Sequence, residues 1–241
     1  MSSGKTPNSW LKHDYANRLV CSQVYAYRAN HSHNRILLID GNAGDGLGAP
    51  RPQYDLFNGE QLSQTTSQVL CGISRRVGNC DVVLCDKDRE KREQLMTHFP
   101  RVPIVERHSD IISFVNGHKY VLWLSDPCGP RGHGPEYMAQ VARLAPLSDF
   151  VIMFNEGAVR RIMGTQSSCW QTSRENYGPL LEPRWWLHKL NKRFFVRTDR
   201  VIQASSGFRY RVLLVSNFIA DQVKRGGFEI IDGRKIEVKN G

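Results

Sequence analysis

The sequence has no long apolar run, no secretory leader, no internal repeat and no low-complexity linker. The first two absences predict a chain that neither inserts into a membrane nor is secreted, so we expect a cytoplasmic protein. The six cysteines form neither a C-x-x-C pair nor a zinc spacing. We therefore expect no metal site, and scattered free thiols suit a reducing compartment.

Acidic residues are few relative to basic ones. The chain of 241 residues has 23 Asp and Glu against 33 Lys and Arg, for a net charge of +10. This excess favours a polyanionic partner, DNA or RNA, and a merely solvated basic surface is the alternative. We expect residues 1–9 to be disordered and residues 10–241 to form a single domain.

The most informative stretch is Arg35–Gly48, RILLIDGNAGDGLG. Its apolar run Ile36–Ile39 is typical of a strand buried on both faces, and the strand ends at Asp40. Glycines then recur in the turn that follows, where they permit positive φ and leave no Cβ in the way. A strand that runs into such a turn can bring backbone close to a nucleotide-like ligand, although an ordinary turn is the alternative.

Strand and helix patterns alternate after this loop. Strands are predicted at Asp81–Cys85, Pro103–Glu106, Tyr120–Ser125 and Phe150–Phe154, and helices at Trp10–Ala29, Glu60–Arg75, Arg89–Phe99 and Glu136–Leu144. This alternation predicts a doubly wound, mostly parallel α/β sheet. Three closing strand-like runs predict an antiparallel hairpin at the sheet edge: Phe194–Ala204, Tyr210–Asn217 and Phe228–Val238.

Four acidic side chains stand at or just after predicted strand ends: Asp40, Asp86, Asp110 and Asp126. Each alone is a common cap or turn residue. Together they lie where ligands bind in an open α/β sheet, beyond the carboxyl ends of the strands. A carboxylate after the second strand suits the two hydroxyls of a ribose. Asp86 lies too far from the glycine loop for the NAD-binding fingerprint, which argues against an NAD enzyme.

At these residues the sequence resembles the class I S-adenosylmethionine-dependent methyltransferases, over about residues 10–217. In that family an acid and a glycine-rich loop end the first strand, an acid after the second strand binds the ribose, and an aspartate after the third lies by the adenine. The resemblance implies a Rossmann-like fold and S-adenosylmethionine as cofactor. It implies cofactor contacts at Asp40, Gly41, Asn42, Ala43, Gly44, Gly46, Asp86, Lys87 and Asp110.

Within that class the pattern is similar to the three-Cys-motif partner group (TcmP-like). That group pairs a Lys-His near the start with an I-D-G-x-A-G-x-G loop and a D-P-x-G motif. The matching residues here are Lys12-His13, Ile39–Gly46 and Asp126–Gly129. The substrate of the group is poorly defined, so this likeness bears on the fold more than on the reaction.

The predicted fourth strand ends in a loose form of the D-P-P-Y motif of amino-methylating enzymes, Asp126-Pro127-Cys128-Gly129. In those enzymes the acid and a proline carbonyl accept hydrogen bonds from the target NH₂, while an aromatic ring stacks on the base. Gly129 replaces that ring, which would come instead from Tyr137, Trp170 or the Trp185-Trp186 pair.

Cys128 leaves two further interpretations open. Its thiolate could attack a pyrimidine as the Pro-Cys of the cytosine-C5 methyltransferases does, with Glu156 protonating the ring. Alternatively, Cys128 is only a small turn residue. The candidate catalytic residues are thus Asp126, Pro127, Cys128 and Glu156.

The stretch Arg184–Arg200 interleaves basic and aromatic residues, a pattern that suits phosphate contact and base stacking. A helix with one solvated basic face and a buried Trp is the alternative. The candidate nucleic-acid contacts are Lys12, His13, Arg184, Trp185, Trp186, Lys189, Lys192 and Arg193. Two functions follow. One is a methyltransferase that acts on a nucleic-acid base, or a related enzyme that transfers a different group to an already modified base. The other is an inactive methyltransferase-like module that binds nucleic acid or a protein partner.

Overall fold

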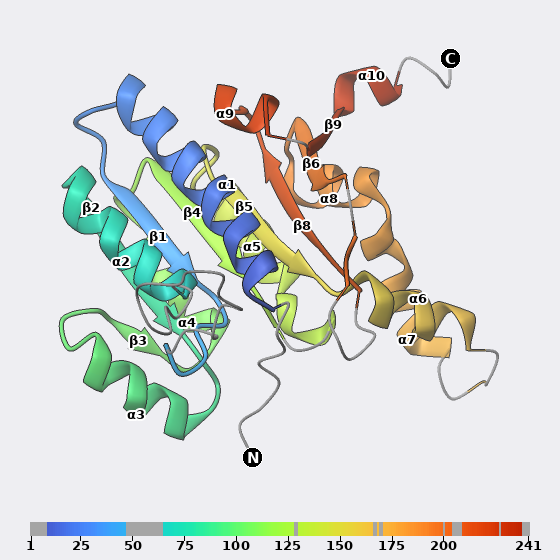
Figure 1. Cartoon of the computed structure of the whole chain (residues 1–241), viewed down its shortest axis with the longest axis horizontal. Helices are drawn as coiled ribbons and strands as arrows, with labels where there is room; N and C mark the ends of the chain where they lie inside the picture. Colours follow the sequence, from blue (N-terminus) through green and yellow to red (C-terminus); the bar gives the residue numbers. More distant parts are fainter. Residues whose placement is uncertain are drawn as a thin grey trace, which may run out of the picture.

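A mostly parallel sheet forms the centre of the molecule (Figure 1). The computed structural model describes residues 9–46, 65–127, 130–165, 168, 171–199, 201–203, 209–226 and 228–237. Within these residues the strands run in the order β3-β2-β1-β4-β5-β8-β6-β9, and β7 pairs with β8. The strands are β1 Ile36–Asp40, β2 Cys80–Cys85, β3 Ile104–Val105, β4 Tyr120–Ser125, β5 Asp149–Phe154, β6 Phe194–Thr198, β7 Ile202–Gln203, β8 Arg209–Ser216 and β9 Phe228–Asp232.

The first five strands are parallel to one another. β1 lies between β2 and β4, β3 lies beyond β2, and β5 lies beyond β4. Every residue of β1, β4 and β5 is buried, as expected for strands that have helices on both faces. The chain changes direction across the sheet between β1 and β4, which is the switch point where ligands bind in open α/β sheets.

The end of the sheet is antiparallel. β8 runs antiparallel between β5 and β6, and β6 pairs antiparallel with the edge strand β9. The predicted fold class, a Rossmann-like doubly wound sheet with a closing antiparallel hairpin, is therefore confirmed. Two predicted strands are shorter than expected: residues 194–204 divide into β6 and β7, and β9 ends at Asp232 because α10, Gly233–Glu237, follows it.

The helices cover both faces of the sheet. They are α1 Ser9–Asn30, α2 Thr66–Val77, α3 Arg89–His98, α4 His108–Val115, α5 Pro135–Leu144, α6 Glu156–Gly164, α7 Gln171–Tyr177, α8 Pro183–Leu190 and α9 Asp221–Lys224. Alternate strand residues such as Leu38 and Leu37 enter two separate hydrophobic layers, one under α1 and α2 and the other under α4, α5 and α8. Among the described residues, no helix combines the length and apolarity needed to cross a bilayer.

One helix start differs from the sequence prediction, and one helix was not predicted. α2 begins at Thr66 because Thr65 and Gln68 cap its first turn reciprocally. Residues 108–110 open α4, for which the sequence analysis predicted no helix, and the Asp110 carboxylate accepts the Arg107 N–H at 3.1 Å. The disordered start was predicted as residues 1–9; Ser9 belongs to α1, and residues 1–8 lie outside the described residues, as do residues 60–64 of the predicted helix Glu60–Arg75.

A buried polar cluster fixes α1 to the sheet. The Asp149 carboxylate accepts hydrogen bonds from the Gln23 amide (2.9 Å), the Tyr120 hydroxyl (2.6 Å) and the Ser216 hydroxyl. Gln23 also accepts the Ala220 N–H at 2.8 Å. Burial raises the pKa of Asp149 to about 6, although hydrogen bonds from Ser216 and Tyr120 oppose that shift.

This cluster makes stability depend on pH. The pKa of Asp149 in the folded state lies above its unfolded value of about 3.9, so its contribution is present below pH 4 and is lost as the pH rises through about 6. Asp149→Asn keeps the acceptor for Gln23 and Tyr120. We expect the wild-type free energy of unfolding to fall by up to about 3 kcal/mol relative to the variant between pH 4 and pH 7. Urea unfolding at several pH values measures this, and parallel curves would contradict it.

Candidate active site

The glycine-rich loop continues β1, and its backbone is hydrogen-bonded to the ends of two further strands, β2 and β4. Gly41 N–H donates to the Leu124 carbonyl at 2.8 Å, and Ala43 N–H donates to the Cys85 carbonyl at 2.9 Å. Gly44 N–H donates to the Asp86 carboxylate at 2.9 Å. Gly44 and Gly46 have positive φ, so this turn requires glycine at both positions. The loop therefore lies across the carboxyl ends of β1, β2 and β4.

Gly41 is needed for a different reason, namely close packing. A Cβ on Gly41 would lie 2.6 Å from the Trp123 indole nitrogen and 3.2 Å from the Leu124 carbonyl oxygen. Trp123 is fully buried in β4, so neither neighbour can move freely. The loop thus approaches β4 at a distance that only glycine allows.

We expect Gly41→Ala to lower the free energy of unfolding by about 1–3 kcal/mol, the usual cost of overpacking a core. Gly72→Ala is the matched control: Gly72 lies inside α2 with no atom within 4 Å of the added Cβ. That control should be neutral or stabilising, because alanine favours helix. Chemical denaturation measures both, and equal stabilities would show that the Trp123 contact is unimportant.

Asp40 is a support of the loop. Its side chain is fully buried and accepts the hydroxyls of Thr66 (2.8 Å) and Ser67 (2.7 Å) at the start of α2. Burial raises the pKa of Asp40 to about 6, although the bonds from Ser67 and Thr66 lower it. The sequence-based role is corrected accordingly: Asp40 contacts neighbouring protein groups and lies away from the solvent-facing surface of the loop.

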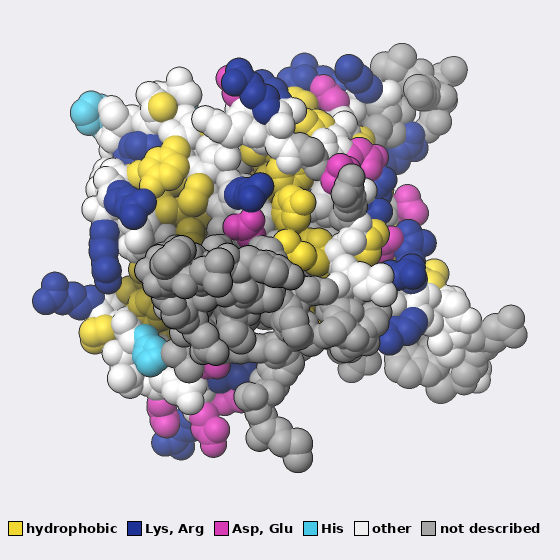
Figure 2. Space-filling model, viewed as in Figure 1, with side chains coloured by type: hydrophobic (Ala, Val, Ile, Leu, Met, Phe, Trp, Pro, Cys, Tyr) yellow, Lys and Arg dark blue, Asp and Glu magenta, His cyan; other side chains and the backbone are white. Residues whose placement is uncertain are grey.

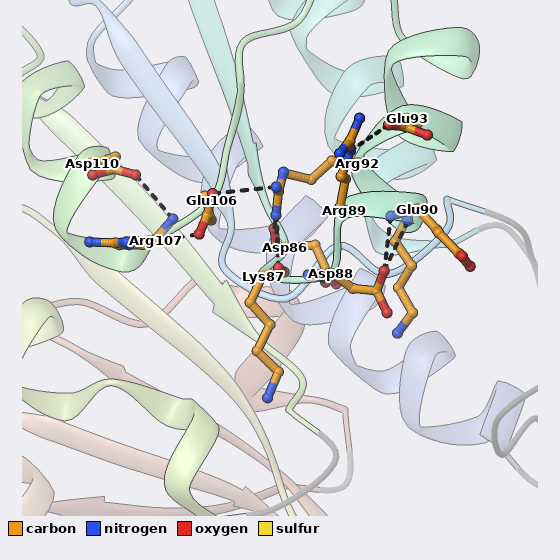
Figure 3. Close-up of polar contacts among 11 residues, drawn as sticks. Asp86, Lys87, Asp88, Arg89, Glu90, Arg92, Glu93, Glu106, Arg107 and Asp110 are labelled. Atoms are coloured by element: carbon orange, nitrogen blue, oxygen red, sulfur yellow. Dashed lines mark hydrogen bonds and ion pairs between the residues drawn. The ribbon is translucent and has the colours of Figure 1, made fainter.

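Asp86 follows β2 and faces the loop directly (Figure 3). One carboxylate oxygen accepts Gly44 N–H and the other accepts Asp88 N–H, each at 2.9 Å. The Arg92 guanidinium donates to the Asp86 carbonyl at 3.0 Å and to Glu106 at 3.3 Å. Lys87 and Asp110 are two further residues predicted to contact the cofactor. Lys87 is exposed, and its side chain extends away from the contacts of Asp86. Asp110 is exposed at the start of α4.

Asp126 directly follows β4 and forms an ion pair with α1. The Lys12 ammonium donates to both carboxylate oxygens, at 2.7 and 2.8 Å, and His13 Nε2 lies 3.7 Å from one of them. Both side chains of the Lys12–Asp126 pair are only 12–13% exposed. The Lys-His pair was predicted to contact nucleic acid. Both residues face the candidate catalytic carboxylate, and their contact with nucleic acid stays a prediction.

The sequence analysis did not predict the contacts of three polar residues in this region, Ser125, His133 and His108. Ser125 and His133 are buried and contact one another, and Ser125 also donates to Asn42 in the loop at 3.1 Å. His108 Nε2 lies 2.7 Å from the Gly41 carbonyl, and burial lowers the pKa of His108. A His beside a strand end was the only sequence signal for either histidine.

Glu156 does not suit the proton donor of the pyrimidine mechanism. Its two carboxylate oxygens lie 2.6 Å from the Arg160 and Arg211 guanidinium nitrogens. Burial alone would raise the pKa of Glu156, but the hydrogen bonds and charges of the two arginines outweigh it, so the pKa is lowered. Pro127 is buried beside Asp126, and Cys128 lies outside the described residues, as do Trp170 and Arg200.

The basic stretch after residue 184 is largely paired with acids. Lys189 forms an ion pair with Glu136, Arg193 with Asp232 and Arg197 with Glu229, at 2.6–2.8 Å. Lys192 is buried and donates to the Pro146 carbonyl, and Trp186 is fully buried with its N–H on the Leu180 carbonyl.

Both Lys192 and Trp186 are therefore core residues, which corrects their assignment to nucleic-acid contact. Trp185 is half-buried against Trp186, and Arg184 is exposed. Figure 2 shows Lys and Arg side chains scattered over one face, most of them toward its edge. Within the described part of the chain, no group of His, Cys, Asp and Glu could hold a metal ion.

Comparison with known proteins bears on the fold. No protein-family model and no curated protein matches the sequence. The structure is similar to that of protein LPL1258 from Legionella pneumophila, a DUF519 protein, with a TM-score of 0.59 and 12% identity over 96% of this chain and 99% of that one. This likeness shows a shared fold along nearly the whole of both chains.

Two weaker likenesses are to methyltransferases. One is the plantazolicin methyltransferase BpumL in complex with a pentazolic desmethylPZN analog and SAH (TM-score 0.46, 12% identity, 84% of this chain and 85% of that one). The other is a TehB-like SAM-dependent methyltransferase from Corynebacterium glutamicum (TM-score 0.39, 14% identity, 85% and 97%). The strand order and its antiparallel end define the class I methyltransferase fold.

Proposed function

We propose that this protein is an S-adenosylmethionine-dependent methyltransferase whose acceptor is an amino group of a nucleic-acid base. The observation that carries the proposal is the position of Asp126, a largely buried carboxylate at the end of β4. At the same edge of the sheet, the glycine-rich loop continues β1 and is hydrogen-bonded to the ends of β2 and β4, at the switch point.

The loop fits the proposed cofactor. At Gly44 no atom of the described residues lies within 4 Å of the place a Cβ would take, so these residues leave room for a ligand against the backbone there. Asp86, beside Gly44, is the residue that the family resemblance assigns to the ribose, and Asp110 is the one it assigns to the adenine. The cofactor would supply an activated methyl group. The residues of the chain would bind it and orient the acceptor.

The chemistry asked of Asp126 is hydrogen-bond acceptance. Its carboxylate and the Pro127 carbonyl would accept the N–H groups of the acceptor and so direct the nitrogen lone pair toward the methyl group. Pro127 has no N–H of its own and biases Asp126 toward an extended backbone. The net charge of +10 supports a nucleic-acid acceptor. The basic stretch at residues 184–200 supports a nucleic-acid acceptor less strongly, because three of its basic side chains are paired with acids.

An inactive binding module is the second candidate. The observation that favours it is the Lys12 ammonium on both oxygens of Asp126, since an acceptor must share or displace those bonds. Glu156 does not support the Cys128 mechanism. Its lowered pKa keeps the carboxylate ionised, and that mechanism needs it to donate a proton.

One experiment separates these candidates. Wild-type protein is incubated with methyl-labelled S-adenosylmethionine and total RNA or DNA, and the nucleosides are analysed by mass spectrometry. A methylated amino group supports the proposal, and C5-methylated pyrimidine supports the Cys128 mechanism. Cofactor binding without transfer supports the inactive module, and label on protein alone rejects a nucleic-acid acceptor.

A further inference from the structure

Three polar side chains form a chain of contacts between the glycine-rich loop and the segment after β4. Ser125 Oγ lies 3.1 Å from Asn42 Oδ1 and 3.1 Å from His133 Nδ1. His133 closes η1, Pro130–His133, and is 1% exposed, while Ser125 is fully buried. The contacts therefore join the end of β1, the end of β4 and the segment that leads to α5.

Counting hydrogens fixes the direction of these bonds. Asn42 Nδ2 faces the Gly132 carbonyl at 3.5 Å, which places the amide oxygen toward Ser125, because the reverse orientation would set two acceptors against each other. An amide oxygen only accepts, so the single hydroxyl proton of Ser125 goes to Asn42. Ser125 Oγ can then only accept from His133, and His133 must carry its proton on Nδ1.

The surroundings of His133 keep the ring neutral. Its ring packs between Phe154 and Trp186, with centroid distances of 5.9 and 6.5 Å. Burial lowers the pKa of His133 to about 4, although the charge of Asp126 acts in the opposite direction. The neutral Nδ1–H form is the less common tautomer of free histidine, so its presence would be a specific signature of the bond to Ser125.

The segment around His133 is also packed tightly against the site. A Cβ on Gly132 would lie 2.3 Å from Pro127 Cβ, and one on Gly134 would lie 2.4 Å from His108 Nδ1. His108 in turn contacts the Gly41 carbonyl. Any shift of this segment is therefore transmitted to Pro127 and to the glycine-rich loop.

We propose that His133 is a positioning residue that, as the Nδ1–H tautomer, donates to Ser125 and so couples the cofactor loop at Asn42 to the Asp126–Pro127 end of β4. The roles given to the loop at Asn42 and to Asp126 rest on the proposed function. The His133 tautomer and its hydrogen bonds do not. We refer to Asn42, Ser125 and His133 as the relay.

The first test needs no ligand. Wild-type protein is labelled with ¹⁵N-histidine, and long-range ¹H–¹⁵N correlation at pH 7 identifies the protonated nitrogen of His133, assigned through bonds to its backbone. The relay requires a proton on Nδ1 alone. A proton on Nε2, or a mixture of both forms, overturns it. In Ser125→Ala the preference for Nδ1 should disappear.

The second test compares amides that mimic the two ring nitrogens. His133→Asn places an N–H near Nδ1, whereas His133→Gln places one near Nε2. By calorimetry, we expect S-adenosylmethionine affinity within about twofold of wild type for H133N and about tenfold weaker for H133Q and H133L. Asn42→Ala combined with H133L should weaken binding no further than the stronger single effect.

The outcomes separate the two proposals. Equal affinities for H133N and H133Q, at similar melting temperatures, overturn the coupling. Wild-type protein that does not bind S-adenosylmethionine rejects the proposed function, and the tautomer measurement then decides the relay by itself.

Discussion

Asp126→Asn is expected to reduce methyl transfer by at least about 100-fold while changing S-adenosylmethionine affinity by less than about threefold. The variant keeps the shape of the side chain but loses its charge and one acceptor oxygen. The variant should impair the positioning of the acceptor more than the binding of the cofactor. Among the described contacts, no atom of the glycine-rich loop donates to Asp126. Single-turnover transfer and calorimetry measure the two effects.

Glu136→Gln is the matched control for that variant. Glu136 also accepts a lysine ammonium at both oxygens, at 2.6 and 2.7 Å, but its side chain is 74% exposed on α5. Transfer by this variant should equal that of wild type. Wild-type rates in folded Asp126→Asn protein would exclude Asp126 from the reaction. Equal losses in both variants would indicate a general effect of carboxylate removal.

Asp86→Ala is expected to weaken S-adenosylmethionine binding by about 1–3 kcal/mol, or roughly 5- to 150-fold. The variant removes the carboxylate assigned to the ribose. It also leaves Gly44 N–H and Asp88 N–H without the oxygens that accept them at 2.9 Å. The loop would keep the bond of Ala43 N–H to β2 but lose the bond of Gly44 N–H to the Asp86 carboxylate.

Asp88→Ala separates cofactor binding from helix capping. Asp88 is two residues further along and caps α3 by accepting Glu90 N–H at 3.0 Å and Lys91 N–H at 3.4 Å. Its loss should lower the free energy of unfolding by about 1 kcal/mol and leave cofactor affinity unchanged. Calorimetry measures the S-adenosylmethionine affinity of both variants. An unchanged affinity in Asp86→Ala would remove Asp86 from the cofactor site.

The sequence predicts the parallel core well. β4 coincides with the predicted strand, since six buried residues bounded by Lys119 and Asp126 leave little choice of ends. β5 begins one residue early, at Asp149. A charged residue argues against a buried strand unless its partners are known, and Tyr120, Gln23 and Ser216 come from distant parts of the chain.

The ion pairs of the surface could not be predicted either, because their partners are also distant along the chain. A basic stretch such as residues 184–200 favours nucleic acid until its acids are located, and the partners Glu136, Glu229 and Asp232 lie 32 to 53 residues away. Lys12 is 114 residues from Asp126. Local pattern carries no information about such pairs, so the sequence indicates the residue types of the site but not their contacts.

The attachment of α1 has a consequence for the order in which the chain folds. α1 precedes every strand, yet Gln23 is held by Asp149, Ser216, Phe218 and Ala220, which follow it by 126 to 197 residues. Closing loops of that length costs entropy that must be offset before these bonds form. β1, β2 and β4 need no residue beyond Ser125 to pair with one another. The first helix of the chain is therefore expected to dock last, and Lys12 would reach Asp126 in its final arrangement only after β8 has joined the sheet.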